Sequence, residues 1–138
     1  MTRVSTSDHA SRDFILIGAG GHAKVVRELA ELCGANILGV CDPKFQGTHN
    51  EIWNGLKALG GDEYLSRVNP QTVLLLNGIG MMPGSLIRQG VFERFRAMGF
   101  HFPSLVHPFA WVSHDAHIGD GVQLMAGCVV QPGAWIGI

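Results

Sequence analysis

The stretch VHPFAWVSHDAHIGDGVQLMAGCVVQPGAWIGI, residues 106–138, decides the fold of this protein. A β-branched residue or leucine occupies every sixth position in it. These positions are Val106, Val112, Ile118, Leu124, Val130 and Ile136. A period of six matches neither the 3.6-residue period of a helix nor the two-residue alternation of a single strand. It is typical of a structural repeat.

Small or modest side chains follow four positions after the first five of these residues. They are Ala110, Ala116, Val122, Cys128 and Ala134. The pattern predicts a solenoid of short strands, with the aliphatic side chains inside and three hexapeptides in each triangular turn, as in the left-handed parallel β-helix that it resembles. Its corners are assigned to glycines, which tolerate positive φ or close backbone approach: Gly119, Gly121, Gly127, Gly133 and Gly137. The alternative, an antiparallel hairpin domain, would alternate with period two.

Composition limits the classes of function. The chain has 138 residues, 46% of them hydrophobic and 15% charged, with a net charge of −1. This balance argues against a nucleic-acid partner. No signal peptide or apolar run of membrane-spanning length is visible, so we expect a cytoplasmic protein without a membrane partner. The three cysteines, Cys33, Cys41 and Cys128, form no CxxC pair, so neither a disulfide nor a metal site is predicted.

The first part of the chain has the pattern of an α/β domain. Residues 1–12 are polar without periodicity and are predicted to be a mobile leader. A buried strand is expected over 14–17, a helix over 22–33 that ends at Gly34, and a second strand over 37–41. Together they form one βαβ unit with a Gly-rich loop at the carboxyl end of its first strand.

The region up to residue 105 extends this domain. The sequence predicts a short edge strand over 55–59, a helix capped by Asp62 that reaches Val68, and a buried strand over 72–76. An amphipathic helix is expected over 85–98. We therefore expect a Rossmann-like parallel sheet domain over 13–105, followed by the first coils of a left-handed parallel β-helix over 106–138.

The Gly-rich loop is the main candidate site. Gly18, Gly20 and Ala23 match G-x-G-x-x-A between a strand and a helix, and backbone amides there suit a diphosphate. A glycine at position 20 is also expected to adopt a dihedral that valine cannot. Asp42, at the end of the second strand, is placed to accept from a ribose hydroxyl or a base edge.

The loop that follows the 72–76 strand is expected to face the same ligand. The predicted substrate-binding residues are Gly18, Ala19, Gly20, Gly21, His22, Asp42, Pro43, Asn77, Gly78 and Gly80. His22 either donates to a sugar or phosphate oxygen or only opens the helix. The alternative for the whole loop is a tight turn that binds nothing.

Several motifs occur in an order that resembles a known family. GAGGHAKVV follows the first strand, CDP the second and LNGIG the third, and a Phe-rich helix and HPFA precede the hexapeptides. In this order the chain resembles the sialic-acid O-acetyltransferases and bacillosamine N-acetyltransferases. The resemblance implies a nucleotide-sugar-binding domain before the β-helix, and transfer of an acetyl group from acetyl-CoA to a sugar hydroxyl or amine. It also implies acetyl-CoA as co-substrate and, for the full-length protein, a homotrimer.

The sequence departs from this family at its end. The family's catalytic histidine lies well inside the β-helix, whereas this chain ends after fewer than two coils. We therefore expect the amino-terminal part of a longer transferase, inactive by itself and monomeric or weakly oligomeric, and assign it no catalytic residue. HDAHIG, from His114, has the form of the family's catalytic line. His114 is interpreted as a corner histidine, with a catalytic base as the alternative.

Two other classes of function stay open. The first is an NAD-binding domain of an oxidoreductase, which the Gly loop and Asp42 fit equally well. The hexapeptide repeats argue against this alternative, because such dehydrogenases continue the parallel sheet instead. The second is a non-catalytic scaffold in which the repeats serve only assembly.

Overall fold

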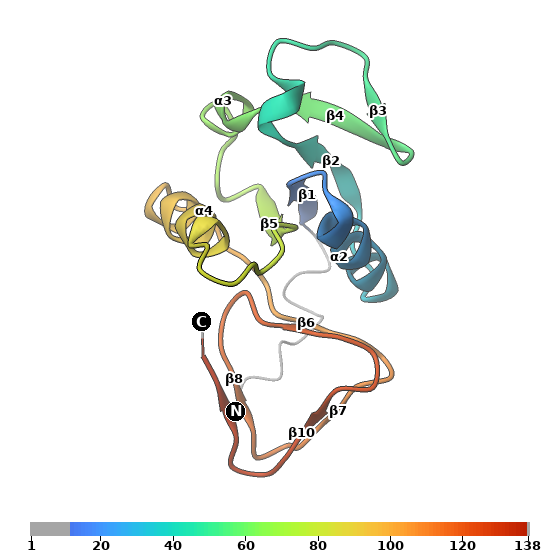
Figure 1. The fold of residues 1–138 in the computed structure, drawn as a ribbon, viewed down its shortest axis with the longest axis vertical. Helices are drawn as coiled ribbons and strands as arrows, with labels where there is room; N and C mark the ends of the chain where they lie inside the picture. Colours follow the sequence, from blue (N-terminus) through green and yellow to red (C-terminus); the bar gives the residue numbers. More distant parts are fainter. Residues whose placement is uncertain (1–11, 138) are drawn as a thin grey trace.

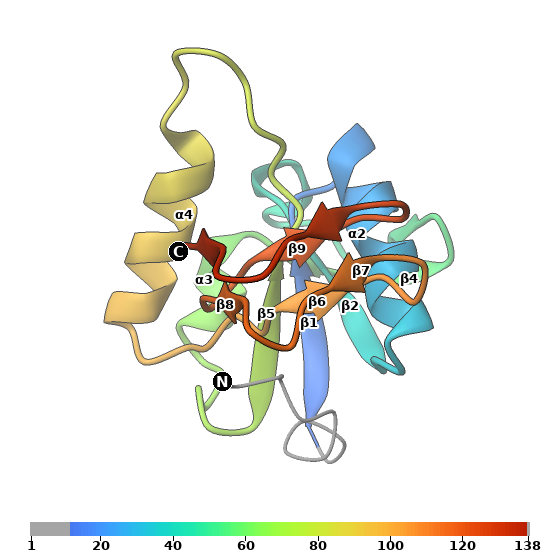
Figure 2. The same cartoon turned by 90° about the horizontal axis from the view of Figure 1, so that it is seen from below.

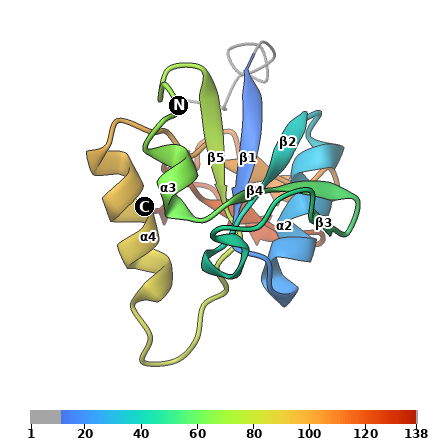
Figure 3. The same ribbon diagram turned by 90° about the horizontal axis from the view of Figure 1, so that it is seen from above.

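The computed structural model describes residues 12–137, so the predicted leader lies outside the described residues except for Arg12. The α/β part is built on a five-stranded sheet of order β3-β4-β2-β1-β5. All strand pairs in it are parallel except β3 with β4. The strands are β1 (Asp13–Ile17), β2 (Ile37–Cys41), β3 (Ile52–Trp53), β4 (Leu56–Gly60) and β5 (Val73–Asn77). Figure 3 shows β5, β1 and β2 side by side in this sheet.

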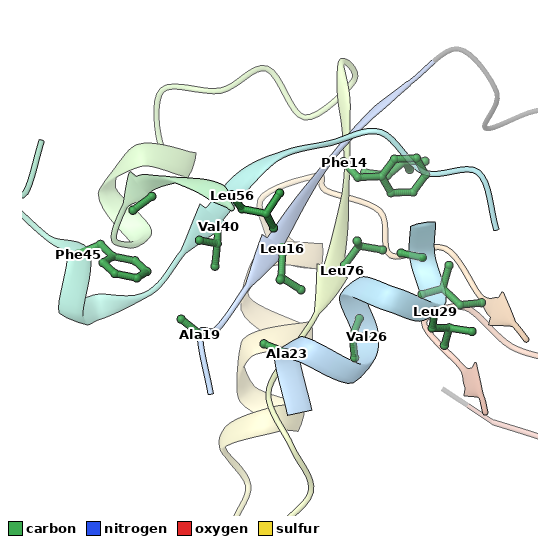
Figure 4. Packing of buried hydrophobic residues seen from close by; sticks show 14 residues of the cluster. Phe14, Leu16, Ala19, Ala23, Val26, Leu29, Val40, Phe45, Leu56 and Leu76 are labelled. Carbon is green, nitrogen blue, oxygen red and sulfur yellow. The ribbon is translucent and has the colours of Figure 1, made fainter. Parts of the chain in front are cut away.

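Helices cover both faces of the sheet, which explains why β1 and β5 are almost continuously apolar. On one face, Leu16 and Leu76 pack against Val26 of α2 (Gly21–Leu32) (Figure 4). On the other, Ile15 and Leu75 belong to the cluster that contains residues of α3 (Asp62–Leu65) and α4 (Ile87–Ala97). Alternate strand residues therefore enter opposite cores. Among the described residues, no helix is long and apolar enough to span a membrane.

Three predicted elements differ from the structure. The 55–59 strand exists as β4, but it is not the edge, because β3 pairs outside it through a turn at Asn54 and Gly55. Both turn residues have positive φ, at 45° and 81°. Asn-Gly is a strong hairpin signal, so this hairpin was predictable from the sequence, although no hairpin was predicted there.

The helix at Asp62 is also shorter than predicted and differently capped. It ends at Leu65, and its N-cap is Gly61, whose amide donates to Glu63 Oε1 at 2.9 Å. Asp62 is instead the first helical residue and pairs with Arg94 of α4. The helix expected from residue 85 begins at Ile87.

Gly90 offers a test of α4. It lies in the exposed interior of this helix, and a Cβ there would meet no atom within 4 Å. Gly90→Ala is expected to raise the free energy of unfolding by about 0.5–1 kcal/mol, because alanine loses less backbone entropy on folding. Urea denaturation measures this. Gly99→Ala is the contrast, because Gly99 has φ +94° and alanine there should destabilise by about 1 kcal/mol. A loss of stability in Gly90→Ala would contradict the expectation.

The carboxyl-terminal part is a coil of short parallel strands, which Figure 1 shows as a triangle below the α/β part. Its strands are β6 (Leu105–Val106), β7 (Trp111–Val112), β8 (His117–Ile118), β9 (Gln123–Leu124), β10 (Val129–Val130) and β11 (Trp135–Ile136). They pair in parallel as β6 with β9, β7 with β10 and β8 with β11. Leu105 lies opposite Gln123, an offset of three hexapeptides, so the predicted three-repeat turn of a β-helix is confirmed.

The interior of the coil follows the six-residue pattern from Val112 onward. Ala116, Val122, Leu124 and Val130 form its buried cluster, against which pack Val112, Ile118, Cys128, Ala134 and Ile136. Val106, on the first strand of the coil, instead remains 37% exposed. Three of the predicted corner glycines have φ between +72° and +76°: Gly121, Gly127 and Gly133.

The coil shares its first strand with the α/β core. Leu105 of β6 is buried in the same cluster as Leu29 of α2, and Met125 packs against that cluster. Figure 2 shows β6 and β9 crossing beneath the sheet and α2. This contact holds the strand β9 close to the carboxyl ends of the parallel strands, where the candidate site lies.

Candidate functional site

Two predicted loops meet at the carboxyl edge of the sheet. They are the Gly-rich loop, which follows β1, and the second loop, which follows β5 and includes Gly78 to Gly80. The Gly18 amide donates to Cys41 O at 2.8 Å, and the Gly78 amide donates to Ile17 O at 2.8 Å. Gly18 has φ +92°, and a Cβ on it would lie 2.8 Å from Ile79 Cδ1. Glycine at 18 therefore serves both the left-handed backbone and the close approach of the second loop.

Gly20 differs from expectation. Its φ of −96° and ψ of −163° are extended, and a Cβ there would have no heavy atom within 4 Å. The prediction of a special dihedral at position 20 was therefore wrong, and that constraint falls on Gly18. Gly21 is equally open. Both glycines are exposed at the start of α2, so a ligand can approach their backbone.

Asp42 shapes the Gly-rich loop. Its Oδ2 accepts from the Ala19 amide at 2.9 Å, and its Oδ1 accepts from the Lys44 amide at 3.0 Å. Pro43 opens the short 3₁₀ turn η1 (Pro43–Phe45) that this second bond caps. Asp42 therefore holds the loop that follows β1 against the turn that follows β2.

The remaining amides of the loop point to an anion site. Within residues 12–137, no acceptor takes the amides of Gly20, Gly21 or His22. Orphan amides at the start of a helix, together with the helix dipole, favour negative charge. The amides of Gly18 and Ala19 already donate to Cys41 O and Asp42 Oδ2. A diphosphate would therefore bind at the α2 end of the loop.

Asn77, Gly78 and Gly80 fold the second loop onto the first. Asn77 is 5% exposed, and its side chain accepts from the Ile79 amide at 3.1 Å and donates to Arg88 O at 3.2 Å. A Cβ on Gly78 would lie 2.9 Å from Ala23 Cβ, and a Cβ on Gly80 would lie 3.2 Å from His22 Cβ. The Asn77 side chain therefore holds the second loop to α4, and glycine at 78 and 80 permits the close approach of the second loop to α2.

The structure adds three polar residues that the sequence analysis missed. Lys44 Nζ donates to Ala19 O at 3.2 Å. Arg88 of α4 donates to the carbonyls of Asn77 and Ile79, and its Nη2 lies 3.3 Å from Gln123 Oε1. Of the three, only Lys44 lies close in sequence to predicted site residues, two positions after Asp42.

Neither Lys44 nor Arg88 forms an ion pair among the described residues. Partial burial also lowers the pKa of the Arg88 guanidinium from its ordinary value. Such a desolvated cation gains more from a nearby anion than an exposed one does.

The structure also shows the surroundings of other reactive groups. Burial, together with the charges of Asp62 and Glu63, raises the pKa of Cys41 to about 12, so its thiol stays protonated and is a poor nucleophile. Within the described part of the chain, no three His, Cys, Asp or Glu side chains are grouped to hold a metal ion. His114 is exposed in a turn between β7 and β8, as predicted for a corner. A cavity of about 230 Å³ beside His101 has no lining residue from either loop.

Comparison with known proteins gives consistent matches. Residues 13–95 match the family model described as the PglD N-terminal domain. The UDP-N-acetylbacillosamine N-acetyltransferase of Bacillus subtilis (strain 168) is 33% identical over 119 residues, which cover 83% of this chain and 52% of that protein.

Two solved structures are similar over nearly the whole chain. PerB from Caulobacter crescentus, in complex with CoA and GDP-perosamine, has a TM-score of 0.78 at 32% identity, covering 91% of this chain and 56% of that one. The acetyltransferase domain of PglB from Neisseria gonorrhoeae, in complex with acetyl coenzyme A, has a TM-score of 0.78 at 36% identity. That match covers 92% of this chain and 59% of the domain. This chain therefore spans a little over half the length of these relatives.

Proposed function

Since the chain belongs to the PglD N-terminal domain family of bacillosamine and perosamine N-acetyltransferases, we propose that its sheet edge binds the nucleotide-sugar substrate of an acetyl-CoA-dependent sugar acetyltransferase. The relatives support this substrate class, because PerB was solved with CoA and GDP-perosamine bound. In the proposed reaction a sugar amine attacks the thioester carbonyl. A new C–N bond forms, the C–S bond breaks, and CoA leaves as the thiol after the amine loses a proton.

The observation that carries the proposal is the set of free amides at the start of α2 together with two nearby cations. The amides of Gly20, Gly21 and His22 have no acceptor in the described structure. Lys44 and Arg88 bind carbonyl oxygens of the two loops, and neither forms an ion pair with a carboxylate among the described residues. A diphosphate supplies the negative charge and the acceptor oxygens that such a set binds. The proposed role of these residues is to hold the nucleotide diphosphate and so to orient the sugar.

An NAD site is the weaker reading of the same loop. In dinucleotide-binding domains, the acidic residue after the second strand accepts from the ribose. Here both oxygens of Asp42 already accept from the amides of Ala19 and Lys44. Asp42 is therefore better suited to hold the loop than to hold a ribose.

Titration calorimetry tests the proposal. A UDP-, GDP- or CMP-linked amino sugar is expected to bind at least about tenfold more tightly than NAD. Lys44→Ala should weaken that binding by about tenfold or more, because a charge-assisted hydrogen bond contributes about 1.5–3 kcal/mol. Lys57→Ala is the matched control, since Lys57 is exposed on β4 and should bind as the parent does. Tight binding of NAD together with no binding of any of these nucleotide sugars would reject the proposal.

A further inference from the structure

A residue of the coil reaches into the candidate site. Gln123 of β9 contacts three groups at the sheet edge: it donates from Nε2 to Asn77 O at 2.9 Å, and its Oε1 lies 3.3 Å from Arg88 Nη2 and 3.1 Å from His22 Nε2. The side chain therefore joins the Gly-rich loop, the second loop and α4. It is the point where the β-helix touches the proposed nucleotide-sugar site.

The chemistry of these partners fixes the direction of each hydrogen bond. Asn77 O is only an acceptor, so the amide NH₂ of Gln123 must face it. Arg88 is only a donor, so Gln123 Oε1 must face Arg88. The same Oε1 lies against His22 Nε2, and two acceptors would repel each other there. His22 Nε2 must therefore carry the proton and donate to Gln123.

The other ring nitrogen of His22 follows from this. In a neutral imidazole with Nε2 protonated, Nδ1 is an acceptor. No hydrogen bond to His22 Nδ1 exists within residues 12–137. We propose that Gln123 is a positioning residue, which locks His22 as the Nε2–H tautomer so that Nδ1 accepts from a hydroxyl or amino group of the bound sugar. This inference rests on the proposed function for the identity of the ligand, but not for the tautomer.

The role differs from the one that the sequence suggested for His22. A donor to a sugar or phosphate oxygen would need a free ring N–H, and the structure commits Nε2 to Gln123. Specificity would follow, because an acceptor at this position favours a sugar that carries a donor group there. A deoxy analogue would leave His22 Nδ1 without a hydrogen-bond donor.

The tautomer is tested by nitrogen NMR of the full chain at alkaline pH, where a free imidazole is neutral. The His22 signals are assigned by comparison with His22→Asn. The parent should show a pyridine-type Nδ1 and a pyrrole-type Nε2 whose proton exchanges slowly with water. In Gln123→Leu this proton signal should be lost, because leucine cannot accept from His22 Nε2. Gln131→Leu, at an exposed turn of the same coil, should resemble the parent.

Calorimetry with the amino-sugar nucleotide found to bind the parent supplies the functional readout. Gln123→Leu should weaken binding by about tenfold, the effect of misplacing one hydrogen-bonding group, and Gln131→Leu should not change it. A protonated Nδ1 in the parent, or Gln123→Leu binding within twofold of the parent, would overturn the inference. A parent that binds no nucleotide sugar would instead contradict the proposed function, and the NMR result would still decide the tautomer.

Discussion

Phe95→Ala is expected to lower the free energy of unfolding by about 3–5 kcal/mol. Phe95 is 1% exposed and lies between α4 and the sheet, in the cluster that contains Ile15 and Leu75. Its ring meets Phe100 edge-on, with 6.1 Å between the ring centroids. Truncation removes the transfer free energy of the ring and leaves a cavity among side chains that relax only partly. A domain of this size has a total stability of about 5–15 kcal/mol, so the loss would be severe.

The measurement is urea denaturation followed by circular dichroism. Phe109→Ala is the matched control, because Phe109 is 79% exposed on the coil and its loss should cost at most about 0.5 kcal/mol. A loss below about 1 kcal/mol for Phe95→Ala would show that α4 does not cover the sheet as the structure describes.

Gly20→Val is expected to reduce nucleotide-sugar affinity by about 100-fold or more, while the free energy of unfolding changes by at most about 1 kcal/mol. The backbone of Gly20 is extended, and a Cβ there meets no protein atom within 4 Å, so valine fits the folded chain. Valine is a poorer N-cap than glycine, which accounts for the small loss of stability. The branched side chain, however, would occupy open space at the start of α2, where the amides of Gly21 and His22 have no acceptor in the described structure. The proposed diphosphate would lose several charge-assisted hydrogen bonds.

Calorimetry and thermal unfolding of the same sample separate the two effects. Gly137→Val is the control, since a Cβ at Gly137 is equally unobstructed but lies in the coil. If Gly20→Val binds within twofold of the parent, the loop is a structural turn and the ligand binds elsewhere. If the variant unfolds instead, the loop is more constrained than its open surroundings indicate.

The sequence by itself determined the elements with a regular period. The six-residue repeat from Val106 predicted parallel strands three hexapeptides apart, and the structure pairs Leu105 with Gln123 at that offset. The strand over 37–41 and the helix end at Gly34, with φ +87°, were also predicted. These features are local, because backbone geometry alone decides which residues share a face or need a positive φ. The Asn54-Gly55 hairpin was equally local, and it was missed because a short strand of only two residues carries no periodic signal.

The tertiary structure alone decided which side chains meet at the candidate site. Gln123 is 101 positions after His22, and no pattern in either segment indicates their contact. The contact arises because Leu105 is buried in the α/β core, which brings β9 to the sheet edge. Likewise, Gly18 and not Gly20 combines a left-handed backbone with close packing against the second loop. The sequence predicts that the loops meet at the carboxyl edge of the sheet. Which amides and cations are left without a partner inside the protein, and so can bind a ligand, is determined only by how the loops pack.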